Sequence, residues 1–187
     1  METKTVIIVL GKPASGKTSV AEKLSEALDI PYYGIDTFKE IIFNKIGWED
    51  LDWSRKVRRA SMRILEKLIE SEIPKCRSLI IEGAFDVESD KQIFEQLMQR
   101  YNFSVVEILC EASGKLLFER FKARAEKGRR HPGHRDRQNL DHYKDWIING
   151  EAKPLGLGPL IRVNTENPKS IDVEALVARI KELIPHV

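Results

Sequence analysis

Eight residues near the N-terminus have the types and spacing of a phosphate-binding loop. They match the pattern G-x-x-x-x-G-K-[ST] and run Gly11-Lys12-Pro13-Ala14-Ser15-Gly16-Lys17-Thr18, with Ser19 next. Glycine at both ends of such a loop lets successive backbone N–H groups turn onto an anion. In this pattern Lys17 reaches the β- and γ-phosphates, and the Thr18 hydroxyl is a ligand for Mg²⁺. The motif therefore predicts a nucleotide site, with Gly11 to Ser19 as its binding residues.

The residues on either side of this loop support the prediction. The run 6–10 is continuously apolar and largely β-branched, as in a strand buried on both faces of a parallel sheet. After the loop, Val20, Leu24 and Leu28 recur at helical spacing. A helix that begins at the loop directs the positive end of its dipole at the phosphates.

Acidic residues stand at the ends of two further predicted strands. Asp36 follows the run 31–35, and Glu82 ends the run 78–82. Ligands of open α/β sheets bind at the carboxyl ends of strands, and a carboxylate there can orient and deprotonate an attacking hydroxyl. Asp36 is therefore our candidate base. The alternative is that Asp36 only caps a helix that begins at Thr37.

The predicted magnesium site consists of Thr18, Asp36 and Glu82. An acid such as Glu82 at the end of a buried strand is costly unless it is used, so we expect it to hold the Mg²⁺ shell or contact the acceptor. Lys39 lies one helical turn after Asp36 on the same face. It is placed to hold an anionic acceptor, and the alternative is a solvated lysine.

A basic segment late in the chain has the character of a mobile lid. Residues 115–137 hold nine Lys or Arg against three acids. Arg120 and Arg124 are one turn apart, so we expect both to point toward the transferring phosphoryl group, as catalytic and nucleotide-binding residues. The segment Arg129-Arg130-His131-Pro132-Gly133-His134-Arg135 follows them, and the lid spans about 120–140. The alternative is a basic surface loop, and we do not interpret the two histidines as metal ligands.

A second basic cluster lies on a predicted helix over 53–73 and consists of Arg55, Lys56, Arg58, Arg59 and Arg63. Arg55, Arg59 and Arg63 recur every four residues and share one face. This stripe either binds a polyanionic acceptor or is a solvated surface. Trp48 and Trp53 flank it, and they either line an acceptor pocket or pack in the core.

Strands and helices alternate along the whole chain. This alternation predicts an α/β fold with a doubly wound parallel sheet. The remaining predicted elements are a helix over 90–101, strands over 105–110 and 160–163, and helices over 113–127, 140–149 and 171–184.

Length and composition indicate one ordinary globular domain over residues 1–187. The chain is 42% hydrophobic and 32% charged, with a net charge of +2, so any basic surface must be local. Two cysteines, Cys76 and Cys110, are too few for a disulfide framework or a metal site. We find no signal peptide and no apolar run that could span a membrane, and we expect a cytoplasmic protein.

Together these motifs resemble the adenylate-kinase-like P-loop kinases. The phosphate loop, Asp36, Glu82-Gly83 and the pair Arg120/Arg124 are most similar to the small AAA-type kinases, which include polynucleotide 5′-kinase, chloramphenicol phosphotransferase and zeta toxin. In polynucleotide kinase an arginine follows the base aspartate by three residues, where this chain has Lys39. The resemblance implies ATP and Mg²⁺, and a three-layer P-loop fold with five parallel strands in the order 2-3-1-4-5. It also implies an adenine pocket between the lid helix and the loop 164–168, which contains Asn167.

The expected activity is therefore transfer of the γ-phosphoryl of ATP to a hydroxyl of a small molecule, by a monomer or homodimer. A nucleic-acid kinase for 5′-OH ends or tRNA and a non-catalytic nucleotide switch are the alternatives. A GTPase should carry N-K-x-D, and the nearest string, Asn164-Thr165-Glu166-Asn167, does not match.

Overall fold

The computed structural model describes residues 4–75, 77–128 and 130–184, so Cys76 and Arg129 lie outside the described residues. Five parallel strands form one sheet in the order β2-β3-β1-β4-β5. The predicted fold class and strand order are therefore confirmed. The strands are β1 (Thr5–Gly11), β2 (Tyr32–Gly34), β3 (Leu79–Glu82), β4 (Ser104–Glu111) and β5 (Leu160–Asn164). The helices are α1 (Lys17–Leu28), α2 (Ile35–Ile46), α3 (Leu51–Glu72), α4 (Lys91–Tyr101), α5 (Gly114–Glu126), α6 (Leu140–Asn149) and α7 (Val173–Leu183).

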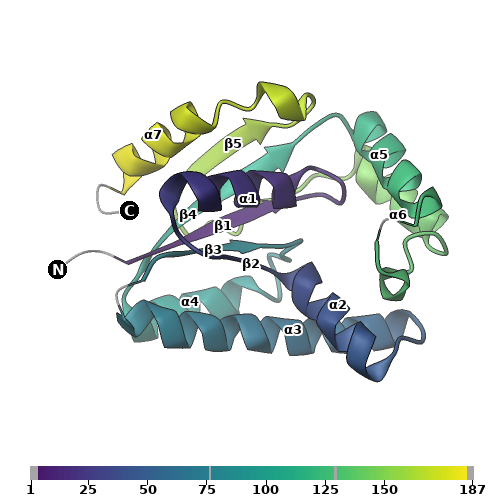
Figure 1. The fold of residues 1–187 in the computed structure, drawn as a ribbon, viewed down its shortest axis with the longest axis horizontal. Coiled ribbons are helices and arrows are strands. Elements are labelled where there is room, and N and C mark those ends of the chain that lie inside the picture. Colours follow the sequence, from purple (N-terminus) through teal and green to yellow (C-terminus); the bar gives the residue numbers. More distant parts are fainter. Residues whose placement is uncertain (1–3, 76, 129, 185–187) are drawn as a thin grey trace.

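The central strand β1 is buried along its whole length, and its side chains alternate between two cores. Val6, Ile8 and Leu10 pack in the core beneath α3 and α4, whereas Ile7 and Val9 pack in the core beneath α1 and α7. A strand that is buried on both faces needs apolar residues at every position, which explains the continuous run. Figure 1 shows the three resulting layers, with α1 and α7 on one face of the sheet and α3 and α4 on the other.

The carboxyl ends of all five strands meet at one edge of the sheet. The start of β1 and the end of α7 lie at the opposite edge, whereas α2, α5 and α6 extend beyond the carboxyl edge (Figure 1). The loop after α6 is fixed by Glu107 in β4, whose buried carboxylate accepts hydrogen bonds from the N–H groups of Leu155 and Leu157, both at 2.6 Å. These elements form the walls of the site described below.

Most element ends agree with the sequence prediction within one or two residues, and the two-residue shift at the start of α2 changes the interpretation of Asp36. α2 begins at Ile35, with Gly34 as its N-terminal cap residue and Asp36 inside its first turn. The interpretation of Asp36 as the cap of a helix that starts at Thr37 is therefore wrong. The physical reason is that the Asp36 carboxylate pairs with a guanidinium from another element and not with the free N–H groups of its own helix.

Within the described residues, no helix is long and apolar enough to cross a membrane.

Candidate functional site

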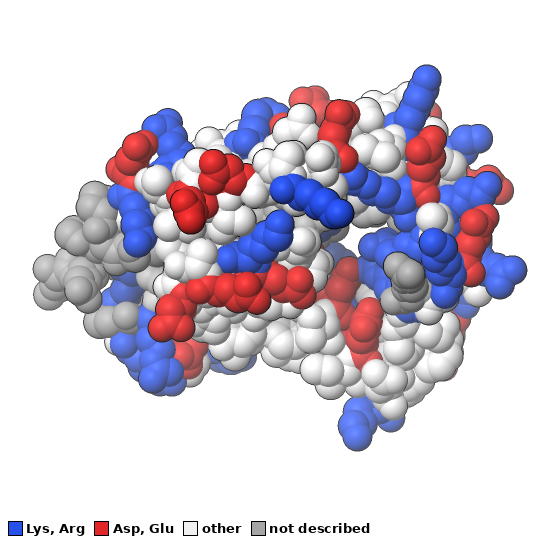
Figure 2. Space-filling model, turned by 45° about the horizontal axis from the view of Figure 1, so that its top comes forward, with Lys and Arg blue, Asp and Glu red and all other residues white. Residues whose placement is uncertain are grey.

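A cleft of about 570 Å³ opens at the carboxyl edge of the sheet. Its walls come from the phosphate loop and α1, from α2 and α3, and from the segment that joins α5 to α6. Figure 2 shows the hollow on this side of the molecule, with lysine and arginine side chains gathered around it. Six cationic side chains but only three carboxylates line the cleft, so it favours an anionic ligand.

The phosphate loop has the backbone that its glycines predict. Gly11 has φ +147°, and a Cβ there would lie 2.5 Å from the Cys110 carbonyl oxygen, so no other residue fits. Gly16 has φ +81° and caps the start of α1, and Ala14 also has a positive φ. The buried Ser15 hydroxyl has no hydrogen-bond partner among the described residues. The loop therefore curves around a concave, polar surface at a helix N-terminus, which suits a phosphate.

The two lysines of the loop point in different directions. Lys17 lines the cleft and donates to the Lys12 carbonyl oxygen at 2.8 Å. Burial lowers the pKa of Lys17, and the Glu82 carboxylate opposes this shift. The Lys12 ammonium instead donates to the Ile147 carbonyl oxygen at 2.9 Å and to that of Gly150, at the end of α6. Lys12 thus anchors the loop to α6, and it can contribute only its backbone to the phosphate site.

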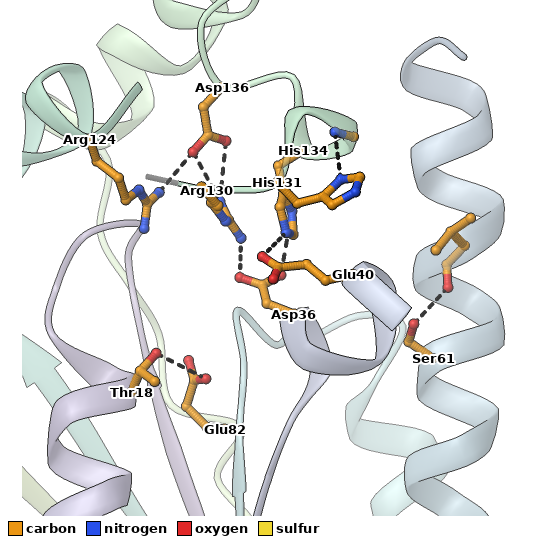
Figure 3. Close-up of polar contacts among 12 residues, drawn as sticks. Thr18, Asp36, Glu40, Ser61, Glu82, Arg124, Arg130, His131, His134 and Asp136 are labelled. Carbon is orange, nitrogen blue, oxygen red and sulfur yellow. Dashed lines mark hydrogen bonds and ion pairs between the residues drawn. The ribbon is translucent and has the colours of Figure 1, made fainter. Parts of the chain in front are cut away.

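Thr18 and Glu82 form a second pair in the cleft. The Thr18 hydroxyl donates to Glu82 Oε2 at 3.3 Å, and Figure 3 shows the two side chains directed toward each other. Glu82 is only 5% exposed, and burial raises its pKa while Lys17 opposes this. A hydroxyl and a carboxylate beside a phosphate loop fit Mg²⁺, which typically takes one or two protein oxygens and completes its shell with water and phosphate. Among the described residues, no cluster of three or more His, Cys, Asp or Glu suggests another metal site.

Asp36 lies across the cleft from this pair and contacts the lid. Its carboxylate forms an ion pair with Arg130, and His134 Nδ1 lies 3.8 Å from its other oxygen. Burial alone would raise the pKa of Asp36, but the nearby cations, with Arg130 first among them, together outweigh burial and the pKa falls to about 2. Asp36 is therefore ionised at any physiological pH.

Two of the lid arginines, Arg124 and Arg130, form one network at the cleft. Asp136 accepts hydrogen bonds from Arg124 at 3.0 Å and from Arg130 at 3.2 Å, so Arg130 bridges Asp136 and Asp36 (Figure 3). The buried Nε of Arg124 has no partner among the described residues. Arg120 donates to the carbonyl oxygens of Thr165 and Glu166, at 3.1 and 2.8 Å, in the loop after β5. The network thus joins the lid to α2, and Arg120 separately joins α5 to the loop after β5.

The His-Pro-Gly-His string docks the lid on α2. The His131 ring stacks on Phe43 with 5.3 Å between ring centroids, and a Cβ on Gly133 would lie 2.6 Å from the same ring. His134 Nε2 lies 2.9 Å from a Glu40 oxygen. Burial, with help from Arg130, lowers the pKa of His134 to about 3, so the ring is neutral and donates its Nε2 proton to Glu40.

The structure brings most of the predicted site residues into one cleft. Those that line it are Pro13, Ala14, Gly16, Lys17, Thr18, Ser19, Asp36, Lys39, Glu82, Arg120 and Arg124. Gly11, Lys12 and Ser15 belong to the phosphate loop but do not line the cleft. Asn167 does not line the cleft, because its side chain accepts the Lys169 N–H at 3.1 Å, and its contact with adenine stays a prediction.

Sequence reasoning named Arg130 only as part of the lid and Arg58 only as part of the second basic cluster. It did not select five other residues that line the cleft: Ser54, Ala84, Asp136, Tyr143 and Trp146. The predicted stripe Arg55/Arg59/Arg63 faces away from the cleft and is exposed. Arg55 pairs with Asp52, and Arg63 pairs with Glu66 and Glu70. Arg58 lies three residues after Arg55 and is adjacent to the stripe on the helix surface. It is the arginine of this helix that lines the cleft.

Comparison with known proteins agrees with this fold. A protein from Chloroflexus aurantiacus J-10-fl, described as a candidate kinase, is 34% identical, with a TM-score of 0.86 over 97% of this chain and 96% of its own. Kti12 from Chaetomium thermophilum, in complex with ADP-AlF3, is 16% identical with a TM-score of 0.66, over 96% of this chain and 98% of its own. The Mycobacterium tuberculosis APS kinase CysC, in complex with AMPPNP and APS, is 16% identical with a TM-score of 0.59, over 98% of each chain. The last two show the fold alone.

No curated protein sequence matches the chain. Residues 6–148 match the family model described as an AAA domain, and this range includes the phosphate loop, Asp36, Glu82 and the lid. The resemblance to small P-loop kinases is thus confirmed at the level of family and fold. The chain belongs to the AAA_33 family of AAA domains.

Proposed function

We propose that this protein is an ATP-dependent kinase that transfers the γ-phosphoryl group to a hydroxyl of a small molecule. One observation carries the proposal. A single cleft holds the phosphate loop and the Thr18–Glu82 pair on one side, the ionised carboxylate of Asp36 on the other, and arginines over its mouth. These are the parts that phosphoryl transfer needs, because its catalysis is mainly positioning and charge stabilisation.

The nucleotide has a defined place in this proposal. The backbone of residues 11–18 and the Lys17 ammonium would hold the β- and γ-phosphates. Thr18, with Glu82 directly or through water, would hold Mg²⁺, which neutralises developing charge on the phosphates when bound. Arg120 contacts the loop after β5 and would lie beside the base, and AMPPNP in the complex of CysC supports an adenine nucleotide in this fold.

Asp36 would accept a hydrogen bond from the acceptor hydroxyl and direct its oxygen at the γ-phosphorus. With a pKa of about 2 it is a weak base, so it orients the hydroxyl early and receives the proton late. A loose transition state needs little nucleophile activation, so orientation is the larger contribution. Arg124 and Arg130 would stabilise charge on the transferring group, since both line the cleft beside Asp36.

A small acceptor fits the cleft better than a nucleic acid does. The lid contacts α2 through Arg130, His131 and His134, which restricts the mouth of the cleft. The exposed stripe that would have supported nucleic-acid binding lies outside the cleft, and two of its three arginines pair with neighbouring acids. The observations therefore favour a small hydroxylated molecule.

The test is a transfer assay with γ-labelled ATP, Mg²⁺ and the pooled small molecules of a cell extract. We expect a labelled small-molecule product from the wild type and none from Lys17→Ala, because the phosphate loop loses the cation that faces the γ-phosphate. Lys45→Ala is the matched control, since Lys45 is exposed at the end of α2. Label on nucleic acid, label only in free phosphate, or unchanged transfer by Lys17→Ala would contradict the proposal.

A further inference from the structure

The cleft wall formed by α2 and α3 contains one cation that no protein group neutralises within the described residues. Lys39 lines the cleft, yet its ammonium forms no hydrogen bond or ion pair with a described residue, and it lies over the Phe43 ring, 5.8 Å from the centroid. Burial lowers the pKa of Lys39, and Asp36 opposes this shift only in part. A half-buried ammonium without a partner is costly and would be stabilised by a bound anion.

The other cations near the acceptor side of the cleft have carboxylate partners, and Arg120 donates to carbonyl groups of the loop after β5. Arg58, which shares this wall, makes a two-pronged ion pair with the buried carboxylate of Asp90, at 2.5 and 3.3 Å. Arg130 is held by Asp36 and Asp136, and Asp136 also holds Arg124. Lys17 lies in the phosphate loop. Lys39 is therefore the cation on the acceptor side whose charge the protein itself leaves uncompensated among the described residues.

A second polar group beside this wall also lacks a partner. Ser54 on α3 lines the cleft and is only 8% exposed, but its hydroxyl makes no hydrogen bond to any described residue. Ser61, farther along the same helix, shows the usual alternative, because its hydroxyl donates to the Val57 carbonyl oxygen at 2.9 Å (Figure 3). The Ser54 oxygen is not among the fully buried atoms of the described residues, so it is open to the cleft and available to a ligand there.

We propose, on the basis of the proposed kinase function, that the acceptor carries a carboxylate or a phosphate close to the hydroxyl that is phosphorylated, and that Lys39 and Ser54 hold this anionic group. Lys39 lies three residues after Asp36 on α2, so the two side chains start about 5–6 Å apart on one helix face. A hydroxyl placed at Asp36 and an anion placed at Lys39 therefore belong to one compact molecule. The acceptor class is small hydroxy acids or phosphate monoesters, and neutral or cationic hydroxyl compounds are disfavoured.

Binding to the protein loaded with ADP and Mg²⁺ tests this proposal, because ADP keeps other anions out of the phosphate loop. Calorimetry would compare glycerate, glycerol 3-phosphate and glycerol, which share hydroxyl groups and differ in the anion. We expect millimolar or tighter binding of at least one charged probe and no measurable binding of glycerol. The charged probe that binds better identifies the anionic group as carboxylate or phosphate.

Two variants test whether Lys39 and Ser54 hold the anionic group of the probe. Lys39→Gln should weaken binding of the charged probe about ten- to a hundredfold, and Ser54→Ala should weaken it by a smaller factor. Lys45→Gln, at an exposed position of the same helix, should bind as the wild type does. Equal binding of glycerol, unchanged binding by Lys39→Gln, or no binding of either charged probe in the millimolar range would overturn the proposal.

The outcomes of these experiments distinguish failure of the anion-site proposal from failure of the kinase proposal. Binding that depends on Lys39 in a protein that transfers no phosphoryl group would support the anion site and contradict the kinase. Transfer to a neutral acceptor at an undiminished rate by Lys39→Gln would support the kinase and overturn the anion site.

Discussion

The ionisation of Asp36 determines what this residue can do for a reaction. Arg130 and, to a smaller extent, Lys39 and Lys17 stabilise its charged form, and the pKa of about 2 leaves almost no basicity near neutral pH. A residue with this pKa still accepts a hydrogen bond and fixes the direction of a hydroxyl. We therefore expect the rate to be insensitive to Asp36 titration above about pH 4.

Replacement of the carboxylate tests that role at the scale of one residue. Asp36→Asn keeps the size of the side chain but removes its charge and frees Arg130. We expect ATP affinity to change little and the transfer rate to fall about 10²- to 10⁴-fold, as for loss of a positioned acid–base group. Nucleotide titration and single-turnover transfer measure the two quantities. Glu26→Gln, at an exposed position of α1, serves as control, and a wild-type rate in Asp36→Asn would show that the carboxylate has no part in transfer.

The sequence predicts some of these residues well because their geometry is local. The phosphate loop needs a glycine at Gly11, where a Cβ would collide with the Cys110 carbonyl, and this need is visible as a motif. Arg130 is different, because its partner Asp36 lies 94 positions away in the chain. Nothing in the spacing of the lid arginines distinguishes Arg130 from its neighbours. Only the fold shows which guanidinium reaches the carboxylate.

At the scale of elements, the lid and α2 behave as two surfaces that fit each other. Because Gly133 has no Cβ, the Phe43 ring can pack against its backbone, and the His131 ring stacks on the same Phe43 ring. Arg135 adds a hydrogen bond to the Glu49 carbonyl oxygen beyond the end of α2. The sequence predicts the helix before the lid and the polar loop within it. It does not predict the docking, because aromatic contacts between distant segments leave no periodic pattern.

A methyl group at Gly133 tests whether this fit matters for transfer. In Gly133→Ala the new Cβ would lie 2.6 Å from the Phe43 ring, so the lid must move away and carry Arg130 from Asp36. We expect faster tryptic cleavage in the lid and a lower transfer rate, by about tenfold, with nucleotide affinity preserved. Gly128→Asn is the matched control in the same segment, because Gly128 has φ +61° with open space around it and asparagine tolerates that conformation. Equal proteolysis and equal rates in both variants would contradict a docked lid.

At the scale of the whole molecule, the parts of the sheet that stabilise the fold are separate from the edge that forms the cleft. The two cores on its faces are apolar and supply stability, whereas the charged groups gather at the carboxyl edge. A net charge of +2 conceals this arrangement, since six cationic side chains meet in one cleft. Composition therefore predicts one domain with an apolar core, but it does not predict the positive electrostatic potential in the cleft. Burial of so many titratable groups at one edge also makes the stability of the fold depend on pH.

His134 should dominate that dependence in mildly acidic solution. Its folded-state pKa of about 3 lies below the ordinary 6.5, so below pH 6.5 the unfolded chain binds a proton that the folded protein excludes. The free energy of unfolding should then fall as the pH drops, by about 1–2 kcal/mol between pH 6.5 and 5. Asp36, with its pKa lowered to about 2 from 3.8, adds its own loss only below about pH 4.

Urea unfolding at several pH values between 4.5 and 7.5 separates the contribution of His134 from that of other groups. His134→Gln keeps a donor for Glu40 but does not titrate, so its unfolding free energy should be lower at pH 7.5 and should vary less with pH. His142→Gln, at an exposed position on α6, should retain the wild-type dependence. If His134→Gln and the wild type lose stability in parallel from pH 6.5 to 5, the ring titrates as freely in the folded protein as in the unfolded chain. The lid would then not bury His134 against α2 in solution, and its contact with Asp36 would be open to solvent.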